Sequence, residues 1–263
     1  MPLTLHNFPT QAEAAAAMRA PGSAYLGGGT LVVRATNEGN IGITRFVRAT
    51  DPALKAIEVT GSLVRLGAGV TMAAVAAHPA LAELAPAARA VGGPAVRNMA
   101  TVGGNLFAPC PYGDFATALL ALDARVGTGE GAQPLEAFLA ARQSLPPGTL
   151  VRAVSFEPAT GLRFSKISRV KPKGISVLSI AALLSVRDGT VRDARIALGA
   201  MAAHPLRARA AEQALIGRKL TRDGISAAVA AIGEGTDPPT DAIASAWYRA
   251  EVLPVHFARL LLG

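Results

Sequence analysis

The sequence predicts an α+β fold for this chain of 263 residues. In the first 159 residues, alanine-rich stretches with helix-start signals are interspersed with short apolar runs bounded by glycines. From residue 160 onward three strand candidates come first, and helix candidates follow them. Strands followed by helices are typical of an α+β unit. The length is sufficient for two domains, or one large one, and for a sizeable core.

The elements of the first 159 residues follow from caps, alanine-rich runs and turn residues. Thr10 and Glu13 have capping-box spacing, so a short helix is expected over 12–18. Thr71 starts a second helix that ends at about His78. Further helices are expected over 80–91, 115–122 and 134–142. Short strands are expected over 24–26 and 31–33, on both sides of Gly61 between 57 and 69, and over 124–126 and 150–156.

In the C-terminal part, strands are expected over 162–167, 176–186 and 191–198. Asp188-Gly189 lies between the last two strands and is a favoured hairpin turn. Helices are expected over 207–215, 222–232 and 242–251. Pro254 is expected to break or kink the chain beyond the last helix, because proline lacks the backbone N–H that a helix interior needs.

Composition excludes several functional classes. No apolar run approaches the ~20 residues that a membrane-spanning helix needs, and the N-terminal residues do not form a secretory signal, so a cytoplasmic protein is expected. Cys110 is the only cysteine, which excludes an internal disulfide and any cysteine-ligated iron–sulfur cluster held by this chain alone. The four histidines have no metal-ligand spacing, and no metal site is expected.

The formal net charge is +8, but the basic residues are mostly scattered. Aromatic residues make up only 5% of the chain, which leaves little for base stacking. The one basic cluster consists of Lys166, Arg169, Lys171 and Lys173. A solvated face is its default interpretation, attraction to an anionic cofactor or an acidic partner comes next, and nucleic acid is not expected.

A first glycine segment, residues 26–31, has the sequence LGGGTL. A simple hairpin turn needs one or two glycines, so three in a row indicate that something approaches this backbone closely. Successive N–H groups in such a loop can converge on an anion such as a diphosphate. The P-loop pattern is absent, and Gly67-Ala-Gly69 is not completed to a Rossmann fingerprint.

A second glycine segment, residues 100–105, has the sequence ATVGGN. Gly103 and Gly104 lack the Cβ atoms that would keep a ligand off the backbone. The Thr101 hydroxyl, the Asn105 amide and the Asp114 carboxylate add donors and acceptors that suit a phosphate-and-ribose ligand. A turn-rich loop without a ligand remains the alternative. Asp114 also has a structural explanation, as the cap of the helix over 115–122.

The stretch RNMATVGGN at 97–105, with Pro111, Asp114 and ALLALD at 118–123, resembles a known signature. It is similar to the FAD-binding medium subunit of the xanthine dehydrogenase and carbon monoxide dehydrogenase (molybdenum hydroxylase) family. The first glycine segment resembles that family's first flavin loop, and 164–166 with Arg169 resembles its later lysine motif. Residues 198–200, 205–207 with Glu212, and 245–249 also agree, so the resemblance covers nearly the whole chain.

The resemblance implies a PCMH-type FAD-binding domain over 1–159, with α+β subdomains of about 1–55 and 56–159. A C-terminal domain over 160–263 would contain a three-stranded antiparallel sheet with helices. Residues 27–31 would wrap the diphosphate, Asp114 would take a hydroxyl, and Lys166 would lie near the flavin. The implied FAD-binding residues are Leu26, Gly27, Gly28, Gly29, Thr30, Leu31, Ala100, Thr101, Gly103, Gly104, Asn105, Asp114 and Lys166.

The function implied by the resemblance is electron transfer. FAD in this chain would take electrons from 2Fe-2S clusters in a small partner subunit, while a molybdopterin-binding large subunit oxidises the substrate. An external acceptor would then receive the electrons, and no residue of this chain would act as a catalytic acid, base or nucleophile. The alternatives are a scaffold subunit that has lost FAD and a free-standing flavin oxidoreductase. The chain departs from the family pattern at Leu31, Val170 and Gly174.

Overall fold

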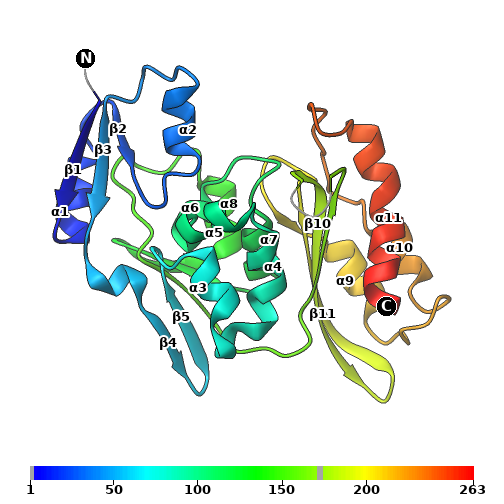
Figure 1. Ribbon diagram of the computed structural model, residues 1–263. Helices are drawn as coiled ribbons and strands as arrows, with labels where there is room; N and C mark the ends of the chain where they lie inside the picture. The colour runs from blue at the N-terminus through cyan, green and yellow to red at the C-terminus, as the bar shows by residue number, and fades with distance from the viewer. Residues whose placement is uncertain (1–2, 171–173) are drawn as a thin grey trace.

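The computed structural model describes residues 3–170 and 174–263. Lys171 and Lys173 of the predicted basic cluster lie outside the described residues. Three sheets follow one another along an elongated molecule, from the N-terminal sheet at one end to the C-terminal helices at the other (Figure 1). This mixture of helices and sheets confirms the predicted α+β class. No helix in the described ranges combines the length and the apolar character that crossing a membrane requires.

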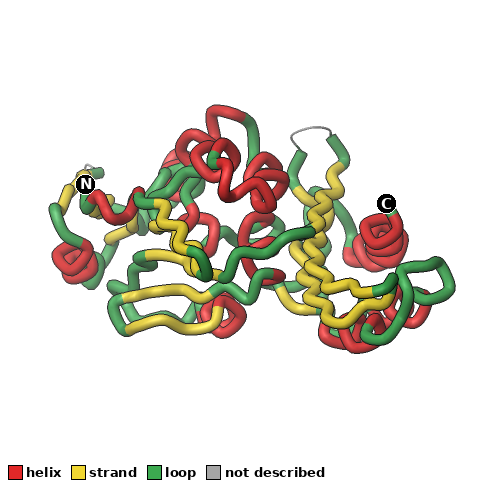
Figure 2. The backbone as a smooth tube through the Cα atoms, turned by 90° about the horizontal axis from the view of Figure 1, so that it is seen from below, coloured by secondary structure: helices red, strands yellow, loops and turns green. Residues whose placement is uncertain are grey.

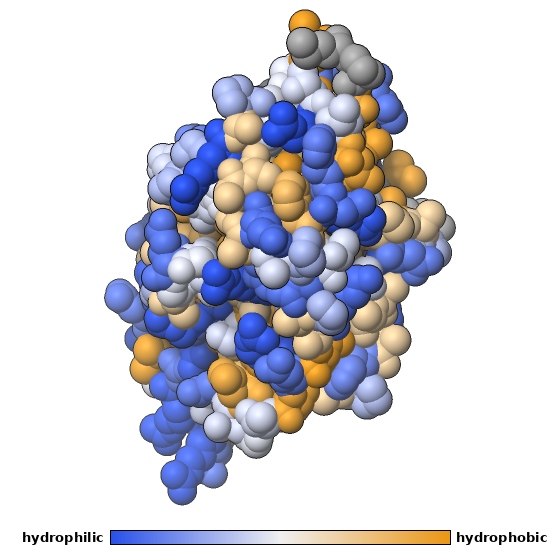
Figure 3. Space-filling model, turned by 90° about the vertical axis from the view of Figure 1, so that its left-hand side faces the viewer, coloured by the Kyte–Doolittle hydropathy of each residue, from blue (hydrophilic) through white to orange (hydrophobic). Residues whose placement is uncertain are grey.

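The N-terminal sheet is parallel and has the strand order β1-β3-β2. Its strands are β1 (Thr4–Phe8), β2 (Ser23–Tyr25) and β3 (Arg45–Ala49), and its helices are α1 (Gln11–Ala17) and α2 (Val32–Asn37). The capping box of Thr10 and Glu13 is present at the start of α1, as predicted. On the surface of this end of the molecule, hydrophilic and apolar residues are interspersed (Figure 3).

The strand predicted over 31–33 is wrong, because these residues enter α2 instead. Gly29 has a φ of +75°, a left-handed conformation that glycine adopts readily. This turn allows the Val33 amide to donate to the Gly29 carbonyl, and the Ala35 amide to the Leu31 carbonyl. A helix therefore forms directly after the glycines, where the pattern of three apolar residues suggested a strand.

The middle sheet is antiparallel and has the order β4-β5-β8-β6-β7. Its strands are β4 (Ile57–Thr60), β5 (Leu63–Gly67), β6 (Arg125–Thr128), β7 (Gly131–Pro134) and β8 (Ala153–Phe156). The accompanying helices are η1 (Pro52–Lys55), α3 (Met72–Ala77), η2 (Pro79–Leu84), α4 (Ala85–Ala90), α5 (Pro94–Met99), α6 (Val102–Leu106), α7 (Asp114–Ala121) and α8 (Leu135–Ala141), of which η1 and η2 are 3₁₀ helices.

Two predictions for this region need correction. The single helix expected over 80–91 is a 3₁₀ helix followed by α4, and Pro86 lies in the first turn of α4, where its missing N–H costs nothing. The second glycine segment, interpreted as part of a turn-rich stretch, starts the short helix α6. Glycine has a low helix propensity, so the two glycines in this segment gave no indication of a helix.

The C-terminal sheet is antiparallel and has the order β12-β11-β10-β9. Its strands are β9 (Arg163–Ser168), β10 (Ser176–Arg187), β11 (Thr190–Gly199) and β12 (Leu206–Arg207), and its helices are α9 (Arg209–Leu215), α10 (Ser226–Ala231) and α11 (Ala246–Leu262). The sheet thus has four strands where three were expected. The additional strand, β12, pairs only two residues with β11, and two residues are too few to show an alternating pattern.

Helices cover both faces of this sheet, as the view from below shows (Figure 2). On one face, Ala181 and Ala197 join the large core that includes α7. On the other, Leu178 and Ile180 join the core built with α9, α10 and α11. Burial on both faces explains why the first seven residues of β10 are all buried.

The turn between β10 and β11 is the predicted one, with positive φ angles at Asp188 and Gly189. Pro254 was expected to break or kink the chain, and the break does not occur, since α11 continues through it to Leu262. Leu253, Phe257 and Leu261 from this helix are buried in the C-terminal core. Burying a side chain of this kind contributes about 1.5–3 kcal/mol, so three together outweigh the ~3 kcal/mol cost of an interior proline.

Candidate functional site

The two glycine segments, about 70 residues apart in the sequence, lie directly against each other. A Cβ atom added to Gly28 would fall 1.7 Å from the carbonyl oxygen of Met99, the last residue of α5, and 3.1 Å from Ala100 Cα. One added to Gly27 would fall 3.1 Å from Thr101 Oγ1. Only a residue without a side chain fits at Gly28, because the obstructing atoms belong to backbone. The missing side chains therefore let the N-terminal part of the chain close against the middle part.

The first glycine segment presents backbone donors that the protein itself leaves unused. Among the described residues, none of the five amides from Gly27 to Leu31 donates a hydrogen bond to another residue. The segment is nevertheless anchored at its start, since the Leu26 amide donates to the Val47 carbonyl of β3 over 2.8 Å. Each residue from Leu26 to Leu31 is partly exposed. A partly exposed run of free amides on an anchored loop matches the requirement for binding an anion.

The second glycine segment has a different character, because all of its amides except that of Thr101 donate hydrogen bonds within the protein. The Thr101 hydroxyl caps α6 by accepting from the Gly104 amide over 3.1 Å, and the Gly103 amide donates to the Ala68 carbonyl over 2.8 Å. A Cβ on Gly103 would lie 2.8 Å from Ala68 Cβ, so this buried glycine permits close packing against the core. Gly104 is exposed, and it is the glycine of this pair that is accessible to a ligand.

Asn105 connects this segment to α7. Its side-chain oxygen Oδ1 accepts a hydrogen bond from the Ala116 amide over 2.9 Å, in the first turn of α7. The Asn105 side chain therefore caps the start of α7. The prediction that Asp114 caps this helix is wrong. Asp114 is instead the first residue of the helix, after Gly113 with its φ of +108°. The Asp114 carboxylate is therefore free for other partners.

Those partners are Lys166 and Ser176. Lys166 Nζ lies 2.9 Å from Asp114 Oδ2 and also donates to the Ala90 carbonyl over 2.8 Å. The Ser176 hydroxyl donates to Asp114 Oδ1 over 2.6 Å. The exposed fractions of the Lys166 and Asp114 side chains are only 13% and 8%. The ion pair joins the end of α4, where a cation is favoured, to the start of α7, where an anion is favoured.

The structure thus brings the predicted residues into one connected set. Gly28 lies against the backbone of Met99 and Ala100. The Asn105 side chain accepts a hydrogen bond from the first turn of α7, and Asp114 is the first residue of that helix. Lys166, from the C-terminal sheet, completes the set and also lines a groove between β9 and α11. Arg34 of α2 donates to the Tyr112 hydroxyl over 3.3 Å, a second link between the N-terminal and middle parts. Sequence analysis missed Ser176, since nothing distinguishes this serine from other polar residues at the start of a strand.

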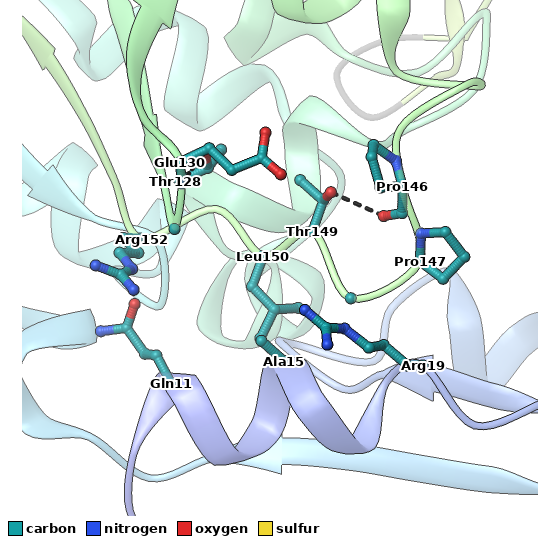
Figure 4. A pocket seen from close by; sticks show the side chains of 12 residues that line it. Gln11, Ala15, Arg19, Thr128, Glu130, Pro146, Pro147, Thr149, Leu150 and Arg152 are labelled. Carbon is teal, nitrogen blue, oxygen red and sulfur yellow. Dashed lines mark hydrogen bonds between the residues drawn. The ribbon is translucent and has the colours of Figure 1, made fainter.

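A separate surface pocket lies between α1, the β6–β7 turn and the loop over 146–150 (Figure 4). Arg19 and Arg152 reach it from two sides, and both are solvent-exposed. None of the residues predicted to bind FAD lines this pocket. In the part of the chain that the structure describes, no group of three or more His, Cys, Asp or Glu side chains could hold a metal ion.

Comparison with known proteins gives two family matches that together cover most of the chain. The family described as FAD binding domain in molybdopterin dehydrogenase matches residues 4–158. The family described as CO dehydrogenase flavoprotein C-terminal domain matches residues 163–263. The resemblance seen in the sequence is thereby confirmed.

Individual relatives have low sequence identity to this chain. The chain is 27% identical over 177 residues to the glyceraldehyde dehydrogenase medium chain of Sulfolobus acidocaldarius, a match that covers 64% of this chain and 63% of that protein. It is 28% identical over 224 residues to the 6-hydroxypseudooxynicotine dehydrogenase complex subunit alpha of Paenarthrobacter nicotinovorans, covering 80% of this chain and 75% of that one.

Solved structures share the fold. Carbon monoxide dehydrogenase from Hydrogenophaga pseudoflava aligns with a TM-score of 0.91 at 24% identity, over 99% of this chain and 96% of that one. Quinoline 2-oxidoreductase from Pseudomonas putida 86 aligns with a TM-score of 0.86 at 20% identity, over 100% and 96%. Since the first family match alone covers more than half of the sequence, the chain belongs to the FAD-binding subunits of the molybdenum hydroxylase family.

Proposed function

We propose that this chain holds FAD where its two glycine segments meet and serves as the electron-transfer subunit of a molybdenum hydroxylase-type complex. The observation that carries the proposal is the contact of Gly28 with the backbone at Met99 and Ala100, beside five free amides. Packing of the N-terminal part against the middle part explains the contact, but it does not explain the unused amide donors beside it. It suits a dinucleotide that must contact both.

The residues present fit FAD by their chemistry. The free amides from Gly27 to Leu31 would hold the diphosphate without a lysine. Gly104 is exposed, and a Cβ atom here would already lie 3.0 Å from Thr101 Oγ1, so a side chain would obstruct the surface that the second half of the cofactor would occupy. Asp114 would accept a hydrogen bond from a ribityl or ribose hydroxyl, and the Lys166 charge would favour electron-rich flavin in a partly dry site. FAD, when bound, supplies a carrier that accepts electrons singly or in pairs.

The proposed electron route is supported by the family and by relatives that are named as medium chains or subunits. Electrons would enter from 2Fe-2S clusters in a small partner subunit and originate at a molybdopterin-binding large subunit. They would leave to an external acceptor. The single cysteine of this chain fits such a division of labour, because any cysteine-ligated cluster must belong to a partner. A cytoplasmic location is part of the same proposal.

The test is FAD binding by a matched pair of variants. Gly104→Trp should abolish binding by covering the exposed surface at Gly104 with an indole ring, with at least a hundredfold rise in the FAD dissociation constant. Gly61→Trp is the control, since Gly61 lies in the exposed β4–β5 turn with no atom near its Cβ position. Wild type and Gly61→Trp should both purify with a flavin absorption spectrum. A colourless wild-type protein that does not take up added FAD would indicate a scaffold subunit, and full FAD content in Gly104→Trp would place the site elsewhere.

A further inference from the structure

The Asp114–Lys166 pair has a third member that no sequence pattern marked. Ser176, the first residue of β10, is 1% exposed. Its hydroxyl donates to Asp114 Oδ1, while Lys166 Nζ occupies Oδ2. The two carboxylate oxygens thus face two different donors, one neutral and one charged. This division fixes the rotation of the carboxylate about its side-chain bond.

The serine matters because the carboxylate is buried. A buried charge is expensive unless it is paired and hydrogen-bonded, and hydrogen bonds to charged groups are about twice as strong as those between neutral groups. The Ser176 hydroxyl offsets part of the negative charge on Asp114. The positive charge of Lys166 is then cancelled less completely by its partner, so more of its field reaches the surroundings.

Ser176 is itself held from the opposite side by α11. Arg249, which is fully buried, donates through Nη1 to the carbonyls of Ser176 and Val177. Its Nη2 donates to both carboxylate oxygens of Asp241 at 2.8 Å each, and its Nε donates to the Pro239 carbonyl over 3.1 Å. The start of β10 is therefore clamped between α11 and α7. A continuous set of hydrogen bonds leads from the C-terminal helix to Lys166.

We propose that Ser176 is a positioning residue for the flavin site, acting through Asp114 on the field that Lys166 exerts. This inference rests on the proposed function. Removing the hydroxyl leaves the full negative charge of Asp114 facing Lys166 and frees the carboxylate to rotate. Electron-rich, reduced flavin loses stabilisation as a result, so the midpoint potential of bound FAD becomes more negative.

The chain provides a close control on the same strand. Ser179 of β10 is also 1% exposed, and its hydroxyl also faces α7, where it lies 3.4 Å from Thr117 Oγ1. Ser176→Ala and Ser179→Ala therefore remove the same group from equally buried positions of β10. Only the first variant loses a bond to the carboxylate. Ser176→Thr keeps a hydroxyl at the position and serves as the rescue variant.

The experiment measures the midpoint potential of bound FAD and the FAD dissociation constant in the full-length chain, with thermal melting to verify folding. Ser176→Ala should lower the potential and weaken FAD binding up to about tenfold, which corresponds to ~1.4 kcal/mol. Ser179→Ala should leave both values unchanged, and Ser176→Thr should restore them in large part.

The other possible outcomes distinguish a failure of the role proposed for Ser176 from a failure of the proposed function. If wild type and Ser176→Ala bind FAD with the same potential, Ser176 has no positioning role, although the proposed function stands. If Ser176→Ala loses FAD, restoration by Ser176→Thr supports the role, whereas an equal loss in Ser179→Ala assigns the effect to general destabilisation and overturns it. If the wild-type chain binds no FAD at all, the proposed function itself fails.

Discussion

At the scale of single residues, the absence of one Cβ atom decides whether the two glycine segments can meet. Gly28 faces the Met99 carbonyl oxygen at a distance that no side chain tolerates. Since the obstructing group is backbone, it cannot move aside as a flexible side chain does. Gly103, by contrast, is required by packing against Ala68, and its place in the sequence motif does not need a ligand to explain it.

We expect Gly28→Ala to push the two segments apart and to weaken FAD binding at least tenfold, a loss of ~1.4 kcal/mol or more in binding free energy. The middle core does not include this residue, so the unfolding transition should stay cooperative. Fluorescence titration with FAD measures the effect. Gly61→Ala, at a position with open space, is the matched control, and equal affinities in the two variants would contradict the expected close contact.

At the scale of elements, α11 is attached to the rest of the C-terminal domain through Arg249. This side chain has no solvent exposure and binds carbonyls of β10 as well as Asp241. Breaking a fully buried ion pair by removing one partner costs about 3–5 kcal/mol. The Asp241 side chain is 28% exposed, so Arg249→Ala should lower the free energy of unfolding in urea by the lower part of that range. Arg187→Ala, which removes an arginine that is 83% exposed, should change it by less than ~0.5 kcal/mol.

The Arg249–Asp241 pair should also make the free energy of unfolding depend on pH. Burial raises the pKa of Asp241, but hydrogen bonds from the Ala244 and Ile243 amides and the Arg249 charge outweigh burial and hold this pKa below its usual range. A carboxylate with a lowered folded-state pKa stabilises the protein above its unfolded pKa of about 3.9, and this contribution is lost as the pH falls through the lower, folded value. Melting temperatures of wild type and Asp241→Asn should therefore converge below about pH 4. A constant difference from pH 7 to pH 3 would contradict this.

At the scale of the whole molecule, this chain carries neither a metal cluster among its described residues nor a cysteine set for one. The two glycine segments lie against each other, and Lys166 is linked to the second one through Asp114 and α7. Because the proposed function assigns substrate oxidation to a partner subunit, we expect the flavin of the isolated chain to stay oxidised when a reducing substrate of the complex is added. Absorbance of the flavin under anaerobic conditions measures this, with dithionite as the positive control. Rapid bleaching by substrate without partners would favour a free-standing enzyme.

Local sequence patterns were sufficient to predict the local features of this chain. The capping box at Thr10, the turn at Asp188-Gly189 and the strands around Gly61 depend on neighbouring residues alone, so their patterns sufficed. The family, and with it the fold, was recognisable because its motifs are continuous in the sequence. For the same reason, the glycine segments could be identified as candidates for binding one cofactor.

Which groups come into contact depends on the folded arrangement of elements that are distant in the sequence. The capping of α7 by Asn105, the role of Ser176 and the contact of Gly28 with Met99 join residues from different elements. Strand β12 and the passage of α11 through Pro254 likewise depend on the neighbours that these elements bury against. Local propensities are worth about 1 kcal/mol per residue or less for ordinary residues and ~3 kcal/mol for proline, and packing between distant elements contributes more, so propensity could not foresee these outcomes.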